Sequence, residues 1–133
     1  MSDSTIIEVR SDTDIVLARQ QGRALATKVG FSQVELTMIV TAISELARNI
    51  VLYAGHGEIR LQIERNHHMT GLVVIAADNG PGIRDVKLAM QDGYSTSGGL
   101  GIGLPGIQRL MEDFHIDTTV GKGTTITVKR WKR

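Results

Sequence analysis

The sequence contains no cysteine and carries almost no net charge, and each shortage excludes a kind of protein. Without cysteine the chain has no disulfide framework, no zinc-thiolate site and no thiol nucleophile. Its formal net charge of +1 gives no reason to expect nucleic acid or a membrane surface as a partner. The first residues lack the basic and apolar regions of a signal peptide, and no uninterrupted apolar run approaches the ~20 residues that span a bilayer. We therefore expect a soluble, cytoplasmic protein.

Glycine is the residue that the sequence has in excess. The chain of 133 residues contains 15 glycines and is 41% hydrophobic, which suits one domain over residues 1–133 with a buried core. A cluster of these glycines falls at Gly98, Gly99, Gly101, Gly103 and Gly106. Each glycine costs backbone entropy when it is ordered, so the cluster needs a use other than packing. Backbone without side chains lets N–H groups approach an anion such as phosphate closely.

Hydrophobic periodicity and turn residues predict the order of secondary structure along the chain. Ser32 and Glu35 form a capping box that begins a helix, which we expect to end near Ala54. The expected elements are strand 5–10, helix 12–29, helix 32–54, strands 58–65 and 72–77 joined by a turn at 66–71, a short helix at 85–92, helix 104–114, and strands 115–120 and 124–129. This order predicts an α+β fold, a two-layer α/β sandwich with helices on one face of a mixed, mostly antiparallel sheet.

Asp78 and the segment after it indicate a nucleotide site. Asp78 follows the apolar run 72–77, an expected central strand, and a carboxylate there needs a partner such as the exocyclic amine of adenine. Gly80 and Gly82 would let a base lie close to the chain, although a surface turn formed by DNGPG is the alternative. The glycine run further on opens a helix, where the helix dipole and free N–H groups favour phosphate. A nucleotide is therefore the expected ligand.

Glu45 and Asn49 lie four residues apart on the second predicted helix, so they share one side of it. An amide oxygen such as that of Asn49 suits Mg²⁺, which takes one or two protein oxygens and completes its octahedron with phosphate oxygens and water. Glu45, one turn earlier, could hold or deprotonate an attacking hydroxyl or water. The alternative is a surface glutamate and an asparagine without a functional role.

Two common nucleotide motifs do not explain the glycine run. The segment 101–106 fits G-x-G-x-x-G, but residues 95–98 before it do not form a strand, and no acidic residue ends a second strand about twenty residues further on. The phosphate-loop pattern G-x-x-x-x-G-K-[ST] is absent too, because Lys122 is followed by Gly123. A dinucleotide fold is therefore not expected.

Four features in a fixed order resemble the Bergerat-fold ATP site of the gyrase, Hsp90, histidine kinase and MutL superfamily. They are E-x-x-x-N on a helix, D-x-G-x-G after a strand, G-x-G-x-G at a helix start and G-x-G-T between two strands. The resemblance covers about residues 11–128 and implies ATP and Mg²⁺ as cofactors, with Asn49 on the metal and Glu45 as the catalytic carboxylate. The nucleotide-binding residues that it implies are Asn49, Asp78, Gly80, Gly82, Ser97, Gly98, Gly99, Leu100, Gly101, Ile102, Gly103, Leu104 and Thr124. Residues 83–98 would form a mobile lid.

Within that superfamily, the segments SELARNI, AADNGPGI and DGYSTSGGLGIGLPGIQRLMEDF are similar to the bacterial switch kinases of the stressosome. This resemblance implies a protein serine/threonine kinase that phosphorylates STAS-domain proteins, the stressosome scaffold and an antagonist. After phosphorylation the kinase would be released to activate a phosphatase by direct binding. The alternative is an anti-sigma-type module that uses ATP to shape a protein-docking surface. No nucleic acid or membrane partner is implied by either.

One departure from the switch kinases concerns charge. Some of them place an arginine just before the glycine run, where it can reach the γ-phosphate, whereas this chain has Ser95, Thr96 and Ser97 there. The cations of its predicted lid, Arg84 and Lys87, lie far upstream. Charge stabilisation is the main contribution to phosphoryl transfer. We therefore expect slow turnover until a partner orders the lid.

Three other groups of residues have no clear catalytic pattern. His56, His67 and His68 are expected in surface turns rather than at a metal. The basic segment 129–133 is expected to be a solvated tail, with an acidic partner as the alternative. Arg48 points away from the predicted core stripe, and either a partner contact or a solvated position fits it.

Overall fold

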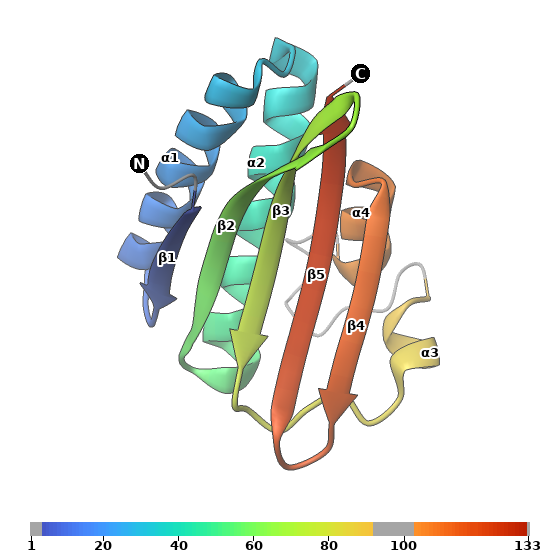
Figure 1. Cartoon of the computed structure of the whole chain (residues 1–133). Helices are drawn as coiled ribbons and strands as arrows, with labels where there is room; N and C mark the ends of the chain where they lie inside the picture. Colours follow the sequence, from blue (N-terminus) through green and yellow to red (C-terminus); the bar gives the residue numbers. More distant parts are fainter. Residues whose placement is uncertain (1–3, 92–102, 133) are drawn as a thin grey trace.

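The structure is a computed structural model that describes residues 4–91 and 103–132. The sheet has five strands, and Figure 1 shows them side by side with the helices α1, α2 and α4 behind them. In chain order the elements are β1 (Ser4–Val9), α1 (Asp12–Val29), α2 (Gln33–Asn49), the π-helix η1 (Ile50–Ala54), β2 (Gly57–Asn66), β3 (Met69–Asp78), α3 (Val86–Ala89), α4 (Gly103–Leu110), β4 (Asp113–Thr119) and β5 (Gly123–Lys132). The predicted order of strands and helices is confirmed.

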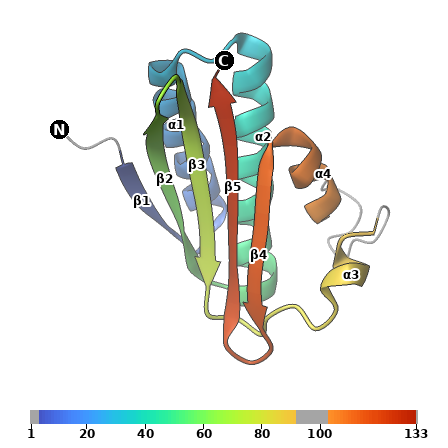
Figure 2. The ribbon, with the colours of Figure 1, turned by 45° about the vertical axis from the view of Figure 1, so that its right-hand side comes forward.

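The strands form one open sheet in the order β1-β2-β3-β5-β4. Every pairing among these strands is antiparallel, so the expectation of a mixed sheet is wrong in that respect. The α+β, two-layer architecture is confirmed, since Figure 2 shows the long helices on one face of the sheet. β3 lies in the middle of the sheet, as its continuous apolar sequence predicted. The sheet therefore buries one face under helices and has two exposed edges, β1 and β4.

The core lies between α1, α2 and the helix-facing side of the sheet. The side chains predicted for the buried stripe of the second helix, now α2 and the start of η1, are each at most 2% exposed, and they are Ile39, Ile43, Leu46, Ala47 and Ile50. Gly22 on α1 faces this stripe, and a Cβ there would lie 2.2 Å from the side chain of Ile43. Glycine at this position lets the two helices pack closely over the sheet. Burial of this stripe, at roughly 1.5–3 kcal/mol for each large aliphatic side chain, fixes α2 along β3.

Several helix and strand boundaries differ from the prediction because strand pairing extends beyond the residues that the local sequence pattern marked as strands. β3 begins at Met69, which pairs with Asn66, so the predicted turn at 66–71 shrinks to His67 and His68. α4 ends at Leu110 instead of continuing to Phe114, because Phe114 and Ile116 alternate toward the core as part of β4. The helix expected near 85–92 is confined to Val86–Ala89. Tertiary packing of alternating apolar residues decided these ends.

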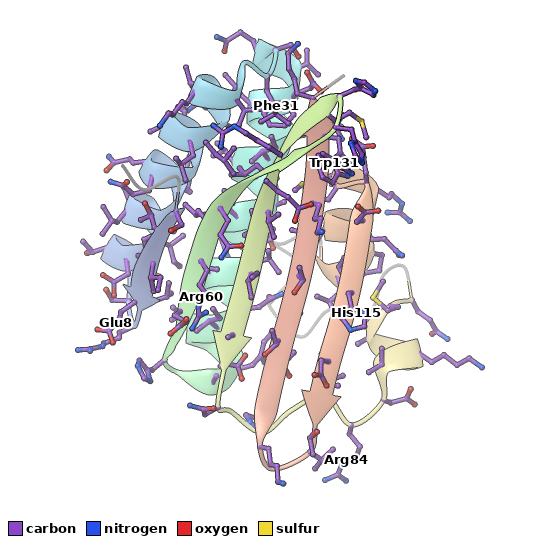
Figure 3. All side chains as sticks on the ribbon, in the orientation of Figure 1. Glu8, Phe31, Arg60, Arg84, His115 and Trp131 are labelled. Carbon is purple, nitrogen blue, oxygen red and sulfur yellow. The ribbon has the colours of Figure 1, made fainter. Side chains whose placement is uncertain are left out.

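The basic C-terminal segment is not a solvated tail, because residues 129–132 belong to β5. Arg130 donates from Nη1 to the carbonyl of Leu110 at 2.9 Å, and its Nε lies 3.6 Å from the carboxylate of Glu35. The backbone N–H of Trp131 donates to Glu112 at 2.9 Å. Figure 3 shows Trp131 and Arg84 at opposite ends of the sheet. The tail prediction failed because a run of cations gave no strand signal.

The helix formed by α2 and η1 together spans Gln33–Ala54, and its 22 residues are long and apolar enough to cross a membrane by length and composition. The expectation that no segment could span a membrane rested on uninterrupted apolar runs alone. Within this helix, 50% of the most apolar window is buried in the fold. Because the core helix of a soluble protein passes the same test, the finding is weak support for a membrane span.

Glu35 closes the predicted capping box, which the structure confirms. The hydroxyl of Ser32 accepts from the N–H of Glu35 at 3.2 Å, and the carboxylate of Glu35 accepts from the N–H of Ser32 at 3.1 Å. The hydrogen bond from the Ser32 backbone holds the pKa of Glu35 below its ordinary value of 4.5, and the Ser32 hydroxyl, Arg130 and Lys132 act in the same direction. The ionised carboxylate therefore stabilises the start of α2.

We expect Glu35→Gln to lower the free energy of unfolding by about 0.5–1 kcal/mol at pH 7, since glutamine keeps the capping geometry but loses the charge. A carboxylate whose pKa falls on folding stabilises the protein above its unfolded pKa, near 4.5, and stops doing so as the pH drops through the lower folded value. Urea titrations of both proteins from pH 7 to pH 3 measure the difference. A difference that grows toward low pH would contradict this account.

Candidate functional site

A row of polar residues crosses the sheet where β3 ends. Asp78 is in register with Gly57 of β2 and with Thr124 of β5, and Thr124 is in register with Thr118 of β4. Asp78 shares its face of β3 with the core residues Leu72, Val74 and Ala76, so the row lies on the side covered by helices. The structure thereby brings together the predicted residues Asp78 and Thr124, which are far apart in the sequence.

One of the two carboxylate oxygens of Asp78 is hydrogen-bonded within the protein. Its Oδ1 accepts from the N–H of Gly80 at 2.9 Å, which forms a tight turn immediately after β3. No hydrogen bond to Oδ2 is found within residues 4–91 and 103–132. An ionised carboxylate is an acceptor only, so Oδ2 is suited to an N–H donor on a ligand. The surface-turn alternative describes the backbone here but leaves this oxygen unexplained.

The C-terminal end of the second long helix lies over this row. Ile50, in η1, is in contact range of Gly57, since a Cβ on that glycine would lie 2.8 Å from the Ile50 side chain. Ala54 lies against Gly80 in the same way, at 2.6 Å. Asn49 immediately precedes η1, so the packing of η1 carries Asn49 toward the end of β3 that holds Asp78. The predicted helix residues and the predicted strand residues therefore belong to one region.

The helix reaches this region through a change of geometry that the sequence did not predict. An α-helix was expected to run to Ala54, but from Ile50 onward it widens into the π-helix η1, which closes with the N–H of Gly55 donating to the carbonyl of Ile50 at 2.8 Å. The wider turn keeps Ile50 only 2% exposed. Gly55, at φ 80, ends the helix. Single π-turns of this kind occur often at functional sites.

Glu45 and Asn49 carry the groups that were predicted to perform chemistry. Glu45 is 8% exposed, and Asn49 is partly buried. Neither side chain has a hydrogen bond or an ion pair within the part of the chain that the structure describes. The surface-glutamate alternative for Glu45 is therefore wrong as to exposure.

Arg48, between these two residues in the sequence, also has an unused polar group. Its Nε is buried and has no hydrogen-bond partner among the described residues. The alternative of a solvated Arg48 therefore does not hold for this atom, and a contact with another molecule or with residues outside the described ranges accounts for it better.

The site fits one magnesium ion only if the nucleotide supplies most of its ligands. No group of three or more His, Asp or Glu side chains in the described ranges could hold a metal, and the chain has no cysteine. The oxygen of Asn49 is a suitable single ligand for Mg²⁺, whose remaining positions are commonly filled by phosphate oxygens and water. The donor set therefore suits a metal that arrives with a phosphate ligand.

The glycines near Asp78 are required by the protein's own packing. A Cβ on Gly80 would meet Ala54, and a Cβ on Gly82, at φ +77, would lie 2.5 Å from the carbonyl oxygen of Thr119. The prediction that these glycines admit a base therefore has a second physical reason that does not depend on a ligand. The turn beyond Gly80 is held further by the N–H of Gly121, which donates to Pro81 at 2.8 Å.

The predicted glycine cradle falls only partly within the described residues. Ser97, Gly98, Gly99, Leu100, Gly101 and Ile102 lie outside the described residues. Gly103, at φ 68, and Leu104, 8% exposed, begin α4 as expected. Pro105 lies in the first turn of α4, where its missing N–H does no harm. Arg84 and Lys87, the cations of the predicted lid, are exposed.

The structure adds a residue that the sequence reasoning missed. The hydroxyl of Thr118 accepts from the N–H of Ile83 at 2.9 Å and lies 2.8 Å from the hydroxyl of Thr124. Alternation along the last predicted hairpin was the signal that could have found it, since Thr118 shares a face with Ile116 and pairs with Thr124. Thr118 thus ties the base of the site to the loop after Asp78.

We expect Gly123→Ala to disrupt the site, because a Cβ there would lie 2.0 Å from the carbonyl oxygen of Asp78 at a φ of +134. Gly121→Ala is a matched control, since it has φ +83 but nothing within 4 Å of the added carbon. The control should lose about 1–2 kcal/mol of unfolding free energy from backbone strain alone, and Gly123→Ala at least about 3 kcal/mol. Equal losses in urea titrations would show that the approach to Asp78 is not tight.

The chain belongs to the family of histidine kinase-, DNA gyrase B-, and HSP90-like ATPases, whose profile matches residues 35–133. That range contains the row across the sheet, the end of α2 and the whole glycine run. The α+β fold predicted from the sequence is the fold of this family.

Two relatives show which branches of the family the chain is similar to. It is 49% identical to the serine/threonine-protein kinase RsbT of Bacillus subtilis over 133 residues, covering 100% of both chains. It is 29% identical to an anti-sigma F factor of Caldanaerobacter subterraneus over 118 residues, covering 86% of this chain and 82% of that protein.

Solved structures agree on the fold. The RsbU and RsbW domains of a Mycobacterium tuberculosis protein match with a TM-score of 0.62 at 19% identity, over 97% of this chain and 33% of that chain. The mycobacterial sensor histidine kinase MprB matches with a TM-score of 0.55 at 14% identity, over 100% of this chain and 99% of that chain. At such identities the likeness concerns the fold alone.

Proposed function

We propose that this protein is an ATP-dependent protein serine/threonine kinase that acts as a single domain in the cytoplasm. The observation that carries the proposal is the 49% identity to a serine/threonine-protein kinase over the full length of both chains. The packing of η1 supports it, since Ile50 lies against Gly57 and Ala54 against Gly80, which brings the end of the helix that carries Glu45 and Asn49 to the strand end that carries Asp78.

ATP binds, in this proposal, with its adenine at the row on β3 and β5. The free Oδ2 of Asp78 accepts from the exocyclic amine, and Thr124, 7% exposed, lies beside it. The glycine run that leads into α4 is suited to the phosphates, because backbone N–H groups at a helix start favour anions. A carboxylate at one end of the segment 78–106 and a glycine run at the other suit a ligand with a base and a phosphate tail.

The phosphoryl transfer assigns roles to two residues of α2. Asn49 would hold Mg²⁺, which neutralises phosphate charge when bound. Glu45 would orient the hydroxyl of the acceptor serine or threonine and take its proton. The bond between the β-phosphate bridging oxygen and the γ-phosphorus breaks, the hydroxyl oxygen bonds to that phosphorus, and ADP leaves.

STAS-domain regulatory proteins are the proposed substrates, and a phosphatase is the proposed target of the released kinase. A phosphate adds about −1.5 to −2 charge to the partner's surface, enough to turn a favourable contact into a repulsive one. Phosphorylation would thus end one complex and allow another. The relationship to a kinase and to anti-sigma factors supports a partner-switching role.

An anti-sigma-type binding module is the second candidate. It is favoured by the sequence identity of 29%, 30% and 31% between this chain and three anti-sigma F factors. The two functions separate in a capture experiment with Mg-ATP, in which the immobilised protein is offered a sigma factor and a STAS-domain protein together. Retention or phosphorylation of the STAS-domain protein supports the kinase. Stable retention of the sigma factor with an unmodified STAS-domain protein would replace it by the second candidate.

A further inference from the structure

The hydroxyl of Thr118 lies at the centre of a hydrogen-bond network behind the proposed adenine site. It accepts from the N–H of Ile83 at 2.9 Å, reaches the carbonyl oxygen of Gly123 at 3.2 Å and contacts the hydroxyl of Thr124 at 2.8 Å. Thr118 and Thr124 are directly opposite each other in the β4–β5 ladder, and Asp78 is opposite Thr124 on the other side. The acceptor to which Thr118 donates its single hydroxyl hydrogen therefore decides whether Thr124 is a donor or an acceptor toward a ligand.

The number of hydrogens that the two hydroxyls carry indicates which of them donates and which accepts. A hydroxyl has one hydrogen to donate and two lone pairs to accept with. If Thr118 donates to the carbonyl of Gly123, it accepts from both Ile83 and Thr124, and all its hydrogen-bonding capacity is used. If Thr118 donates to Thr124 instead, the carbonyl of Gly123 loses its hydroxyl donor, and one lone pair of Thr118 accepts no hydrogen bond. The first arrangement makes one more hydrogen bond, so it is the more stable in this partly buried place.

We propose that Thr118 is a positioning residue for base selection: its oxygen accepts the hydrogen bond that the Thr124 hydroxyl donates, so that Thr124 faces a ligand only as a hydrogen-bond acceptor. Thr124 and the free oxygen of Asp78 then form a pair of adjacent acceptors. Such a pair suits the two hydrogens of one exocyclic amino group. The inference rests on the proposed ATP site and deepens it, because it names the group on the base that is read and the residue that sets the reading.

The consequence is discrimination at the 6-position of the purine. Adenine carries an amino group there, whereas hypoxanthine and guanine carry an oxygen, which would face two acceptors and no donor. A site built to bind an N–H group rejects analogues that lack it strongly, by about 10⁴–10⁵ where several such bonds are lost. Without the Thr118 hydroxyl, the O–H of Thr124 has no acceptor on β4 and is free to donate to an oxygen at the 6-position.

The test compares the affinities of ATP and inosine 5′-triphosphate for the wild type, Thr118→Val and Thr118→Ser. The preference for ATP should fall about tenfold in Thr118→Val, a change of about one hydrogen bond, and should return in Thr118→Ser, which keeps the hydroxyl. A purely structural role would weaken both nucleotides in parallel and leave their ratio unchanged. An unchanged ratio in a Thr118→Val protein with a cooperative melting transition would overturn the proposal.

A second measurement needs only the wild type and so does not depend on the stability of a variant. In 1-deaza-ATP the ring nitrogen N1 is replaced by CH, which removes an acceptor but keeps the amino group. If Thr124 is an acceptor only, this analogue should bind within about threefold of ATP, while a loss of about tenfold or more would mean that Thr124 donates to N1, and the proposal would be wrong.

The same binding assay distinguishes the proposed role of Thr118 from the proposed ATP site on which it rests. If Asp78→Asn still binds ATP as the wild type does, the adenine site itself is misassigned. If Asp78→Asn loses ATP but the Thr118 variants leave the ratio unchanged, only the role of Thr118 is wrong.

Discussion

Asp78→Asn should abolish ATP binding while the fold persists. The substitution keeps an oxygen that can accept from the N–H of Gly80, at 2.9 Å in the native protein, so the turn after β3 should survive. It replaces the free acceptor with an amide N–H₂ group, which would face the amine of adenine donor to donor. Losing a charged hydrogen bond and adding that repulsion should weaken ATP by about 100-fold or more. Isothermal titration with ATP and Mg²⁺ measures the affinity, and circular dichroism melting measures the fold.

Asp117→Asn is the matched control for this variant. Asp117 is an exposed carboxylate on β4, in register with Thr125 on the face opposite to the row. The same chemical change there should leave ATP affinity within about twofold, since a surface carboxylate away from the ligand contributes little. Wild-type affinity in Asp78→Asn, or an equal loss in both variants, would rule out the assignment of the base site.

Glu45→Gln should slow phosphoryl transfer by about 10²–10⁴-fold while ATP affinity stays close to that of the wild type. Glutamine fits the 8% exposed position of Glu45 without a change in volume but cannot accept the hydroxyl proton. Single-turnover transfer at saturating ATP isolates the chemical step from binding. Glu8→Gln, on the exposed edge strand β1, is the control and should transfer at the wild-type rate. A Glu45→Gln protein that transfers at full rate would remove Glu45 from the catalytic role.

The elements that face the core were predictable because periodicity reports burial directly. The stripe of α2, its capping box at Ser32 and the helix stop near Gly55 followed from spacing and composition. The order of strands and helices followed for the same reason. Asp78 was singled out because a carboxylate at the end of an apolar strand needs a partner, and the structure leaves one of its oxygens without one among the described residues.

The parts that escaped prediction depend on contacts between distant segments. The π-helix η1 is set by the packing of Ile50 and Ala54 against the strand ends, and no local pattern of IVLYA specifies it. Arg130 belongs to a strand because it pairs with Leu72 of β3, and its guanidinium contacts Leu110 and Glu35, partners that its neighbours in sequence do not reveal. Thr118 looked like any strand threonine until the pairing with Thr124 was known.

The assignment of Glu45 and Asn49 was the part that spacing alone supported least. Two polar residues four apart on a helix are common, so the chemistry of an amide oxygen and a carboxylate suggested roles without excluding the alternative of no function, and the resemblance to a family favoured those roles. The structure adds the burial of Glu45 and the packing of η1 against Gly57 and Gly80, which bring this helix end to the strand that carries Asp78. Their catalytic and metal-binding roles stay predictions until the variants are measured.

The measurement that tests the central claim most directly is transfer of label from γ-labelled ATP to a STAS-domain protein, with the wild type, Glu45→Gln and Asp78→Asn side by side. The account predicts labelled serine or threonine on the partner with the wild type and loss of the label with both variants. In Glu45→Gln, ATP should still bind, which separates chemistry from binding. Tight ATP binding by the wild type with no label on the partner would contradict the kinase, and undiminished label with Asp78→Asn would contradict the site.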